Sequence, residues 1–130
     1  MADPVPNKIT ISSGIAWTDG KDTIKDIVSF TVNQVLGGGV IFQTQNIDFA
    51  APEALILGDV APGYITFRNL DATNFVKIGN DASISQVVTK LLPGQGVTIP
   101  TDPTTQWFAQ ADTASVKLLV LAVDGATNAP

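Results

Sequence analysis

Hydrophobic and polar residues alternate along much of this chain in short runs. In the run from Lys8 to Ser12, Ile9 and Ile11 fall on one side and polar residues on the other. Because successive side chains of a β-strand point to opposite faces of the sheet, this alternation predicts half-buried strands. Nine further segments with alternating or β-branched residues are predicted as strands: 26–34, 40–49, 54–57, 64–69, 75–78, 84–92, 97–99, 106–110 and 116–123.

Residues that favour turns separate these segments. Asp19-Gly20 and Pro93-Gly94 are the strongest pairs, since Gly tolerates positive φ and Pro pre-sets the first corner of a turn. Turn signals that recur about every 8–12 residues are typical of an antiparallel β-sandwich or a barrel. The sequence therefore predicts an all-β fold.

Two details of strand arrangement follow from the pattern. Residues 64–69 and 75–78 flank the turn 70–74, and we expect them to pair as a β-hairpin. Residues 116–123 form the most apolar segment, which is typical of a central strand of a sheet.

Length and composition agree with one such domain. The chain has 130 residues, of which 45% are hydrophobic, so it can bury a sizeable core. It contains eleven Asp but only one Glu, one Arg and one Met, and the last three are good helix formers. We expect a single domain over residues 7–124, between an extended N-terminal tail (1–6) and a C-terminal tail (125–130).

The chain has no Cys and no His. A disulfide scaffold, a zinc ribbon, a thiol nucleophile and a Ser-His-Asp triad are therefore excluded. The net charge of −5, with one Arg among seven basic residues, does not favour binding to nucleic-acid phosphates. We expect a non-enzymatic protein with no catalytic residues, no cofactor, no metal site and no nucleic-acid partner.

The mean hydropathy of +0.25 raises the question of a membrane protein. The longest wholly apolar stretch, Leu118 to Val123, is much shorter than the roughly 18–20 residues of a spanning helix. Residues 1–6 contain neither the basic region nor the apolar run of a secretory signal. We therefore predict no membrane segment and no secretory signal.

Three motifs follow one another in the second half of the chain. They are Pro62-Gly-Tyr-Ile-Thr-Phe-Arg-Asn-Leu-Asp-Ala-Thr-Asn-Phe-Val-Lys-Ile-Gly79, Leu91-Leu-Pro-Gly-Gln-Gly96 and Trp107-Phe-Ala-Gln-Ala-Asp112. Over residues 41–124 this succession resembles a pattern in small virion proteins of tailed bacteriophages. The turn Asn69-Leu-Asp-Ala-Thr-Asn74 is the most specific part of the resemblance.

This resemblance implies a fold and a role. Proteins of this kind are antiparallel β-sandwiches, often jelly-roll-like, and serve as capsid decoration (cement) proteins or as other small head or tail components. The chain would then be made in the host cytoplasm and would stabilise the capsid surface. Its partners would be the major capsid protein and copies of itself, by analogy in a homotrimer. The alternatives are a tail-fibre or baseplate domain that binds a host glycan or receptor, and an adhesin unrelated to phages.

Two clusters suggest chemistry and also allow simpler interpretations. Asp19, Asp22 and Asp26 could bind Ca²⁺, but calcium loops need several oxygen ligands at defined spacing and usually a bidentate Glu. We favour a turn with solvated charges. Gly37–Gly39 is not followed by the Gly-Lys-Ser/Thr of a phosphate loop, so it is interpreted as a hairpin or a strand break. A turn role is also expected for Asp71, Asn74, Asn80 and Asp81.

The aromatic residues also allow two interpretations. Trp17, Tyr64, Trp107 and the six Phe could form a stacking platform for a sugar, but Phe30 and Phe67 alternate as core residues do. Trp17, beside a predicted turn, is either packed locally or exposed for contact with another subunit or the capsid. The candidate interface residues are Trp17 and three residues of the tail, which could add a strand to a partner's sheet: Pro4, Val5 and Pro6.

Overall fold

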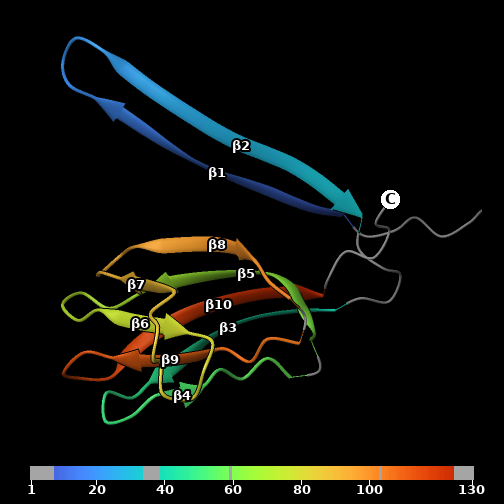
Figure 1. Ribbon diagram of the computed structural model, residues 1–130, viewed down its shortest axis with the longest axis vertical. Coiled ribbons are helices and arrows are strands. Elements are labelled where there is room, and N and C mark those ends of the chain that lie inside the picture. Colours follow the sequence, from blue (N-terminus) through green and yellow to red (C-terminus); the bar gives the residue numbers. More distant parts are fainter. Residues whose placement is uncertain (1–7, 34–38, 59, 103, 125–130) are drawn as a thin grey trace, which may run out of the picture.

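The computed structural model describes residues 8–33, 39–58, 60–102 and 104–124 (Figure 1). These residues form ten strands and no helix, and the strand pairs are antiparallel, which confirms the predicted all-β antiparallel fold. The predicted tails, 1–6 and 125–130, lie outside the described residues. The strands are β1 (Lys8–Thr18), β2 (Thr23–Asn33), β3 (Val40–Ile47), β4 (Glu53–Ala54), β5 (Pro62–Asn69), β6 (Val76–Gly79), β7 (Thr89–Leu91), β8 (Gly96–Pro100), β9 (Phe108–Ala111) and β10 (Val116–Asp124).

The strands form three sheets. β1 and β2 pair with each other in a two-stranded sheet, which we call the hairpin. The other eight strands form two four-stranded sheets, in the orders β3-β10-β5-β8 (the β10 sheet) and β4-β9-β6-β7 (the β9 sheet), and together they make up the body. Figure 1 shows the hairpin (blue) as a separate layer beside the body.

The predicted central strand is confirmed, because β10 lies between β3 and β5. The predicted hairpin of residues 64–69 and 75–78 is wrong. β5 pairs with β10 and β8, whereas β6 pairs with β9 and β7 in the other sheet. The loop between them therefore crosses from one sheet to the other, and the apparent hairpin turn is a connection between layers.

The core lies between the two sheets of the body. Phe67 of β5 and Trp107, which precedes β9, meet there edge to face, with ring centroids 5.8 Å apart. The Trp107 indole N–H donates to Thr101 Oγ1 at 3.1 Å, so its polar atom is paired. On β10 every second residue is buried: Val116, Leu118, Val120 and Ala122. The inward residues of the alternating strands thus form one continuous core between the two sheets.

Two other predicted strands are shorter than expected. Of residues 84–92 only Thr89–Leu91 is a strand, and Ile84 has a φ of +46°, which is incompatible with an extended chain there. Of residues 54–57 only Ala54 belongs to a strand, β4. Gly94, by contrast, has the predicted positive φ (+80°), and Gln95 N–H donates to Leu92 O at 3.0 Å, as in a type II turn.

Candidate docking surface

The hairpin has one apolar and one largely polar face. Because directly opposed residues of an antiparallel pair share a face, the register of β1 and β2 assigns each residue to a side. The apolar face carries Ile9, Ile11, Ser13, Ile15 and Trp17 opposite Val32, Phe30, Val28, Asp26 and Ile24. The polar face includes Lys8, Thr10, Ser12, Ala16, Lys25, Ser29 and Thr31.

Ile27 is the large apolar residue on the polar face, and it lies opposite Gly14. A Cβ added to Gly14 would lie 2.9 Å from Ile27 Cγ1 and 2.6 Å from the backbone oxygen of Asp26. Position 14 therefore needs glycine so that the two strands can approach. The turn also needs one, since Gly20 has a φ of +96°.

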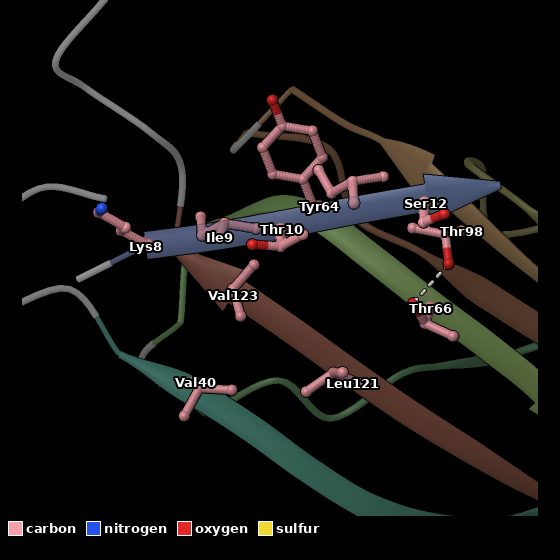
Figure 2. Close-up of a pocket in the computed structure, with 11 residues that line it drawn as sticks. Lys8, Ile9, Thr10, Ser12, Val40, Tyr64, Thr66, Thr98, Leu121 and Val123 are labelled. Atoms are coloured by element: carbon pink, nitrogen blue, oxygen red, sulfur yellow. Dashed lines mark hydrogen bonds between the residues drawn. The ribbon is translucent and has the colours of Figure 1, made fainter. Parts of the chain in front are cut away.

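At its base the apolar face of the hairpin packs on the outer side of the β10 sheet. Ile9 is only 9% exposed, and the Phe30 ring lies 6.2 Å from the ring of Tyr64, an outward residue of β5. Figure 2 shows β1 crossing this face, and the two layers enclose a cavity of about 560 Å³. Its walls include Ile9 and Ile11 of β1 and residues of β3 and β10: Val40, Leu121 and Val123.

Beyond this base the hairpin separates from the body. Its distal apolar residues are the most exposed: Ile15 (78%), Ile24 (65%), Val28 (51%) and Trp17 (51%). A second cavity, of about 750 Å³, lies between the hairpin and the body. Its walls include Ile15, Asp26 and Val28 of the hairpin and the outward residues of β5 and β8: Thr66, Arg68 and Thr98. The Thr66 and Thr98 hydroxyls hydrogen-bond each other at 2.7 Å (Figure 2), so this wall is polar.

The outer face of the β10 sheet carries a second exposed apolar surface. Register places Phe42 opposite Leu121, and Phe42 is 65% exposed. We define the β3–β10 strip as four outward apolar residues of these strands, Val40, Phe42, Leu119 and Leu121; Val123, opposite Val40, also faces outward and lines the cavity at the hairpin base. The strip lies beside the distal hairpin and not beneath it, because the residues that the distal hairpin faces belong to β5 and β8.

The two surfaces carry opposite charge. Among the described residues, Asp26 is the one charged side chain on the apolar face of the hairpin. On the outer face of the β10 sheet the charged side chains of the described strands are Arg68 and Lys117, both basic. Arg68 lies opposite Leu119 of the strip. A surface with the same residues as the hairpin face would therefore be complementary to the sheet face in charge and similar to it in apolar content.

Trp17 is the predicted interface residue that falls within the described part of the chain. It lies on the apolar face near the hairpin tip, opposite Ile24, and about half of it is exposed. Pro4, Val5 and Pro6 lie outside the described residues, so their role stays a prediction.

Sequence reasoning missed Ile15, Ile24 and Phe42 as surface residues. Ser13 and Gly14 interrupt the alternation after residue 12, which hid the second half of β1. Phe42 did leave a signal, since the run 40–49 places apolar residues on both of its faces, and one face had to remain outside a two-layer core.

The acidic residues of the predicted cluster are not gathered into one site. Asp19 Oδ1 accepts hydrogen bonds from the backbone N–H groups of Asp22 (2.8 Å) and Lys21 (3.0 Å), and these bonds lower the pKa of Asp19. Asp26 lies on β2 opposite Ile15. Within residues 8–33, 39–58, 60–102 and 104–124, no group of three or more acidic, Cys or His residues could hold a metal ion.

The loop of residues 69–74 is built around Asn69, which is fully buried. Its Nδ2 donates to Asn74 O (2.8 Å) and Leu91 O (3.0 Å), and its Oδ1 accepts from Asp71 N–H (2.8 Å). Asp71 Oδ2 accepts from the N–H groups of Asn74 and Thr73, which lowers the pKa of Asp71. The polar groups of this loop bond to the chain itself, as expected for a turn.

The aromatic residues of the possible sugar platform lie apart. Trp107 is in the core with Phe67, Tyr64 contacts Phe30 beneath the hairpin base, and Trp17 is near the hairpin tip. In the glycine run only Gly39 is described, and its N–H donates to the Asp124 carboxylate.

Comparison of the chain with known protein families, with curated proteins and with solved structures finds no match. In the part of the chain that the structure describes, no helix is long and apolar enough to cross a membrane.

Proposed function

We propose that this chain is a non-enzymatic structural protein of a virion and that it serves as a capsid decoration protein. The observation that carries the proposal is the exposed apolar face of the hairpin on a chain whose body has a complete core. Monomeric soluble proteins rarely expose extended apolar patches, and such patches mark interaction surfaces. A protein that works by docking needs such a surface and needs no reactive groups.

The virion assignment rests on the three motifs of residues 62–79, 91–96 and 107–112 and on the strand order. We propose that the body is a jelly-roll sandwich. In the orders β3-β10-β5-β8 and β4-β9-β6-β7 the first and last strands of the body are neighbours, and eight strands divide equally between two sheets. Eight strands in two Greek keys form the jelly roll, an architecture used by viral capsid proteins.

In this proposal the partners are the major capsid protein and further copies of the chain, and the location is the capsid surface. The homotrimer remains an analogy with small capsid sandwiches. Docking would be driven by burial of apolar area, which contributes on the order of 25 cal/mol per Å² before the entropic costs of association.

The test uses purified chain and expanded heads of the virus that encodes it, stripped of the chain. We expect the chain to bind these heads and to raise the temperature at which they disrupt. An Ile15→Ser/Trp17→Ser variant, which leaves the body core intact, should bind less and protect less. If the chain binds host cells or glycans but not heads, it is a receptor-binding domain and not a decoration protein. If it binds neither, both hypotheses are wrong.

A further inference from the structure

The hairpin is an incomplete structure on its own. Each strand has eleven residues, roughly 36 Å of extended chain, and within the described residues neither outer edge pairs with a third strand. A two-stranded hairpin is at best marginally stable in water, and open strand edges tend to pair with other chains. The distal half of this hairpin therefore lacks the covering layer that its apolar face requires.

Closure of the hairpin onto its own body would not supply that layer. The distal residues Ile15, Asp26 and Val28 line one cavity with Thr66, Thr98 and Arg68. Closure would bring Asp26 toward Arg68, but it would also bury the apolar side chains of Ile15 and Val28 against the threonine hydroxyls and desolvate them. The apolar surface of the same sheet, the β3–β10 strip, lies to the side of the distal hairpin. Within one chain, Ile9 and Ile11 at the hairpin base share a cavity with Val40 and Leu121 of the strip, whereas the cavity beside the distal Ile15 and Val28 has no strip residue in its walls.

Contact with a second copy of the chain would cover both exposed apolar surfaces at once. We propose that the distal hairpin of one copy packs its apolar face on the β3–β10 strip of the next copy. The base of the hairpin already shows this mode within one chain, since Ile9 and Phe30 pack on the outer side of the same sheet. The proposed contact repeats that layering between chains.

Charge favours the same occupant. The face that docks carries Asp26, and the receiving face carries Lys117 and Arg68 at the Leu119 end of the strip. Arg68 also shares a cavity with Asp26 of its own chain, whereas Lys117 is not in the walls of that cavity. Opposite charges at the edge of an apolar contact favour one orientation over others. A partner with basic residues among its apolar ones would be disfavoured, whereas a copy of this hairpin matches.

Each copy would both give a hairpin and receive one. Such a contact joins two different surfaces, so it gives a reciprocal pair, a closed ring or an open filament of copies, depending on the rotation between neighbours. The inference rests on the proposed role of the chain in assembly, and it names the surface through which copies of the chain meet.

Cysteine crosslinking tests the contact directly, because the natural chain has no Cys and hence no background. Ile24→Cys and Phe42→Cys are made in separate preparations of the full chain, mixed and oxidised. A disulfide forms only where Cα atoms approach within about 7 Å. We expect a crosslinked dimer that contains one copy of each variant.

The matched control is Lys25→Cys mixed with Phe42→Cys, because Lys25 is adjacent to Ile24 but on the polar face. Its crosslinked yield should be much lower. Three outcomes would overturn the proposal: equal yields from Ile24→Cys and Lys25→Cys, crosslinking of Ile24→Cys only with itself, or an intrachain disulfide in a dilute Ile24→Cys/Phe42→Cys double variant. The last result would mean that the hairpin closes on its own body.

Sedimentation of the same purified chain gives the strength of the contact. Ile15→Ser/Trp17→Ser should raise the dissociation constant at least about tenfold, because Trp is among the residue types that most often dominate the binding energy of an interface. The control Thr10→Ser/Thr31→Ser, on the polar face, should leave it unchanged. A chain that stays monomeric at all concentrations contradicts self-docking but leaves head binding intact, so this result and a failure of the proposed function can be told apart.

Discussion

The body and the hairpin follow the same alternating pattern but differ in what covers their apolar residues. In the body, each sheet covers the inward face of the other, and Phe67 and Val120 are fully buried. In the hairpin, Ile15 and Trp17 also lie on one face of a strand, but they remain 78% and 51% exposed. The comparison shows that alternation specifies a strand with two faces, whereas burial depends on what the rest of the chain, or another chain, brings to it.

The same comparison separates stability from association. The body contains its core within one chain and should fold alone. The hairpin contributes little to that core, and its apolar face contributes free energy only when something covers it. Substitutions in the two regions should therefore change different measurements.

The largest effect is expected for Phe67→Ala in the body. Removing a fully buried ring that packs on Trp107 leaves a cavity and should lower the free energy of unfolding by about 3–5 kcal/mol. Urea denaturation measures this change. Phe49→Ala, at an exposed Phe of the body, is the matched control and should cost far less. Equal losses at both positions would mean that the core is not where the structure has it.

Asn69→Ala should have the next largest effect. It removes three hydrogen bonds and leaves Asn74 O, Leu91 O and Asp71 N–H without this partner, at a total cost of about 2–3 kcal/mol. Asn46→Ala, at an exposed position on the outer side of β3, should be nearly neutral. If the two variants unfold at the same urea concentration, Asn69 does not hold the 69–74 loop.

The stability should also depend on pH through Asp71. The N–H groups of Asn74 and Thr73 hold the pKa of Asp71 below its ordinary value of 3.8 in the folded chain. The stabilising contribution of Asp71 is therefore fully present above that value and is lost as the pH falls through the lowered pKa. The difference in melting temperature between the natural chain and Asp71→Asn should shrink below about pH 4. A difference that stays constant from pH 7 to pH 3, as expected for the neutral variant Asn46→Ala, would contradict this assignment.

The smallest effect on unfolding is expected from the hairpin. In dilute solution, Ile15→Ser/Trp17→Ser should change the free energy of unfolding of the body by less than about 0.5 kcal/mol, because both side chains are exposed. In this variant the buried Trp107 is the remaining tryptophan, so its fluorescence reports the body alone. A loss comparable to that of Phe67→Ala would show that the hairpin belongs to the core.

Much of the body could be predicted from the sequence because its strands obey local rules. The apolar run 116–123 predicted the central strand, and Pro93-Gly94 predicted the turn that the structure has. The pairing of 64–69 with 75–78 was wrong because a short polar loop serves equally well as a hairpin turn and as a crossover. Which of the two it becomes depends on long-range pairing with β9 and β10, which no local pattern contains.

The candidate site was predictable only in part. Trp17 could be singled out as an aromatic residue beside a turn, but the β3–β10 strip could not, because its members Phe42 and Leu121 come from opposite ends of the body's sequence. Whether Ile15 is covered or exposed likewise depends on the angle between the hairpin and the sheet. That angle is a property of tertiary packing.

Hydrogen exchange of the full chain at increasing concentration tests most directly the claim that a second copy covers the hairpin. In dilute solution, the amides of the distal parts of β1 and β2 should exchange far faster than those of β10, because little stabilises the open hairpin. As copies associate, exchange in the hairpin should slow while that of β10 stays the same. A hairpin that is as protected as β10 in the dilute monomer, or whose exchange does not depend on concentration, would contradict the account.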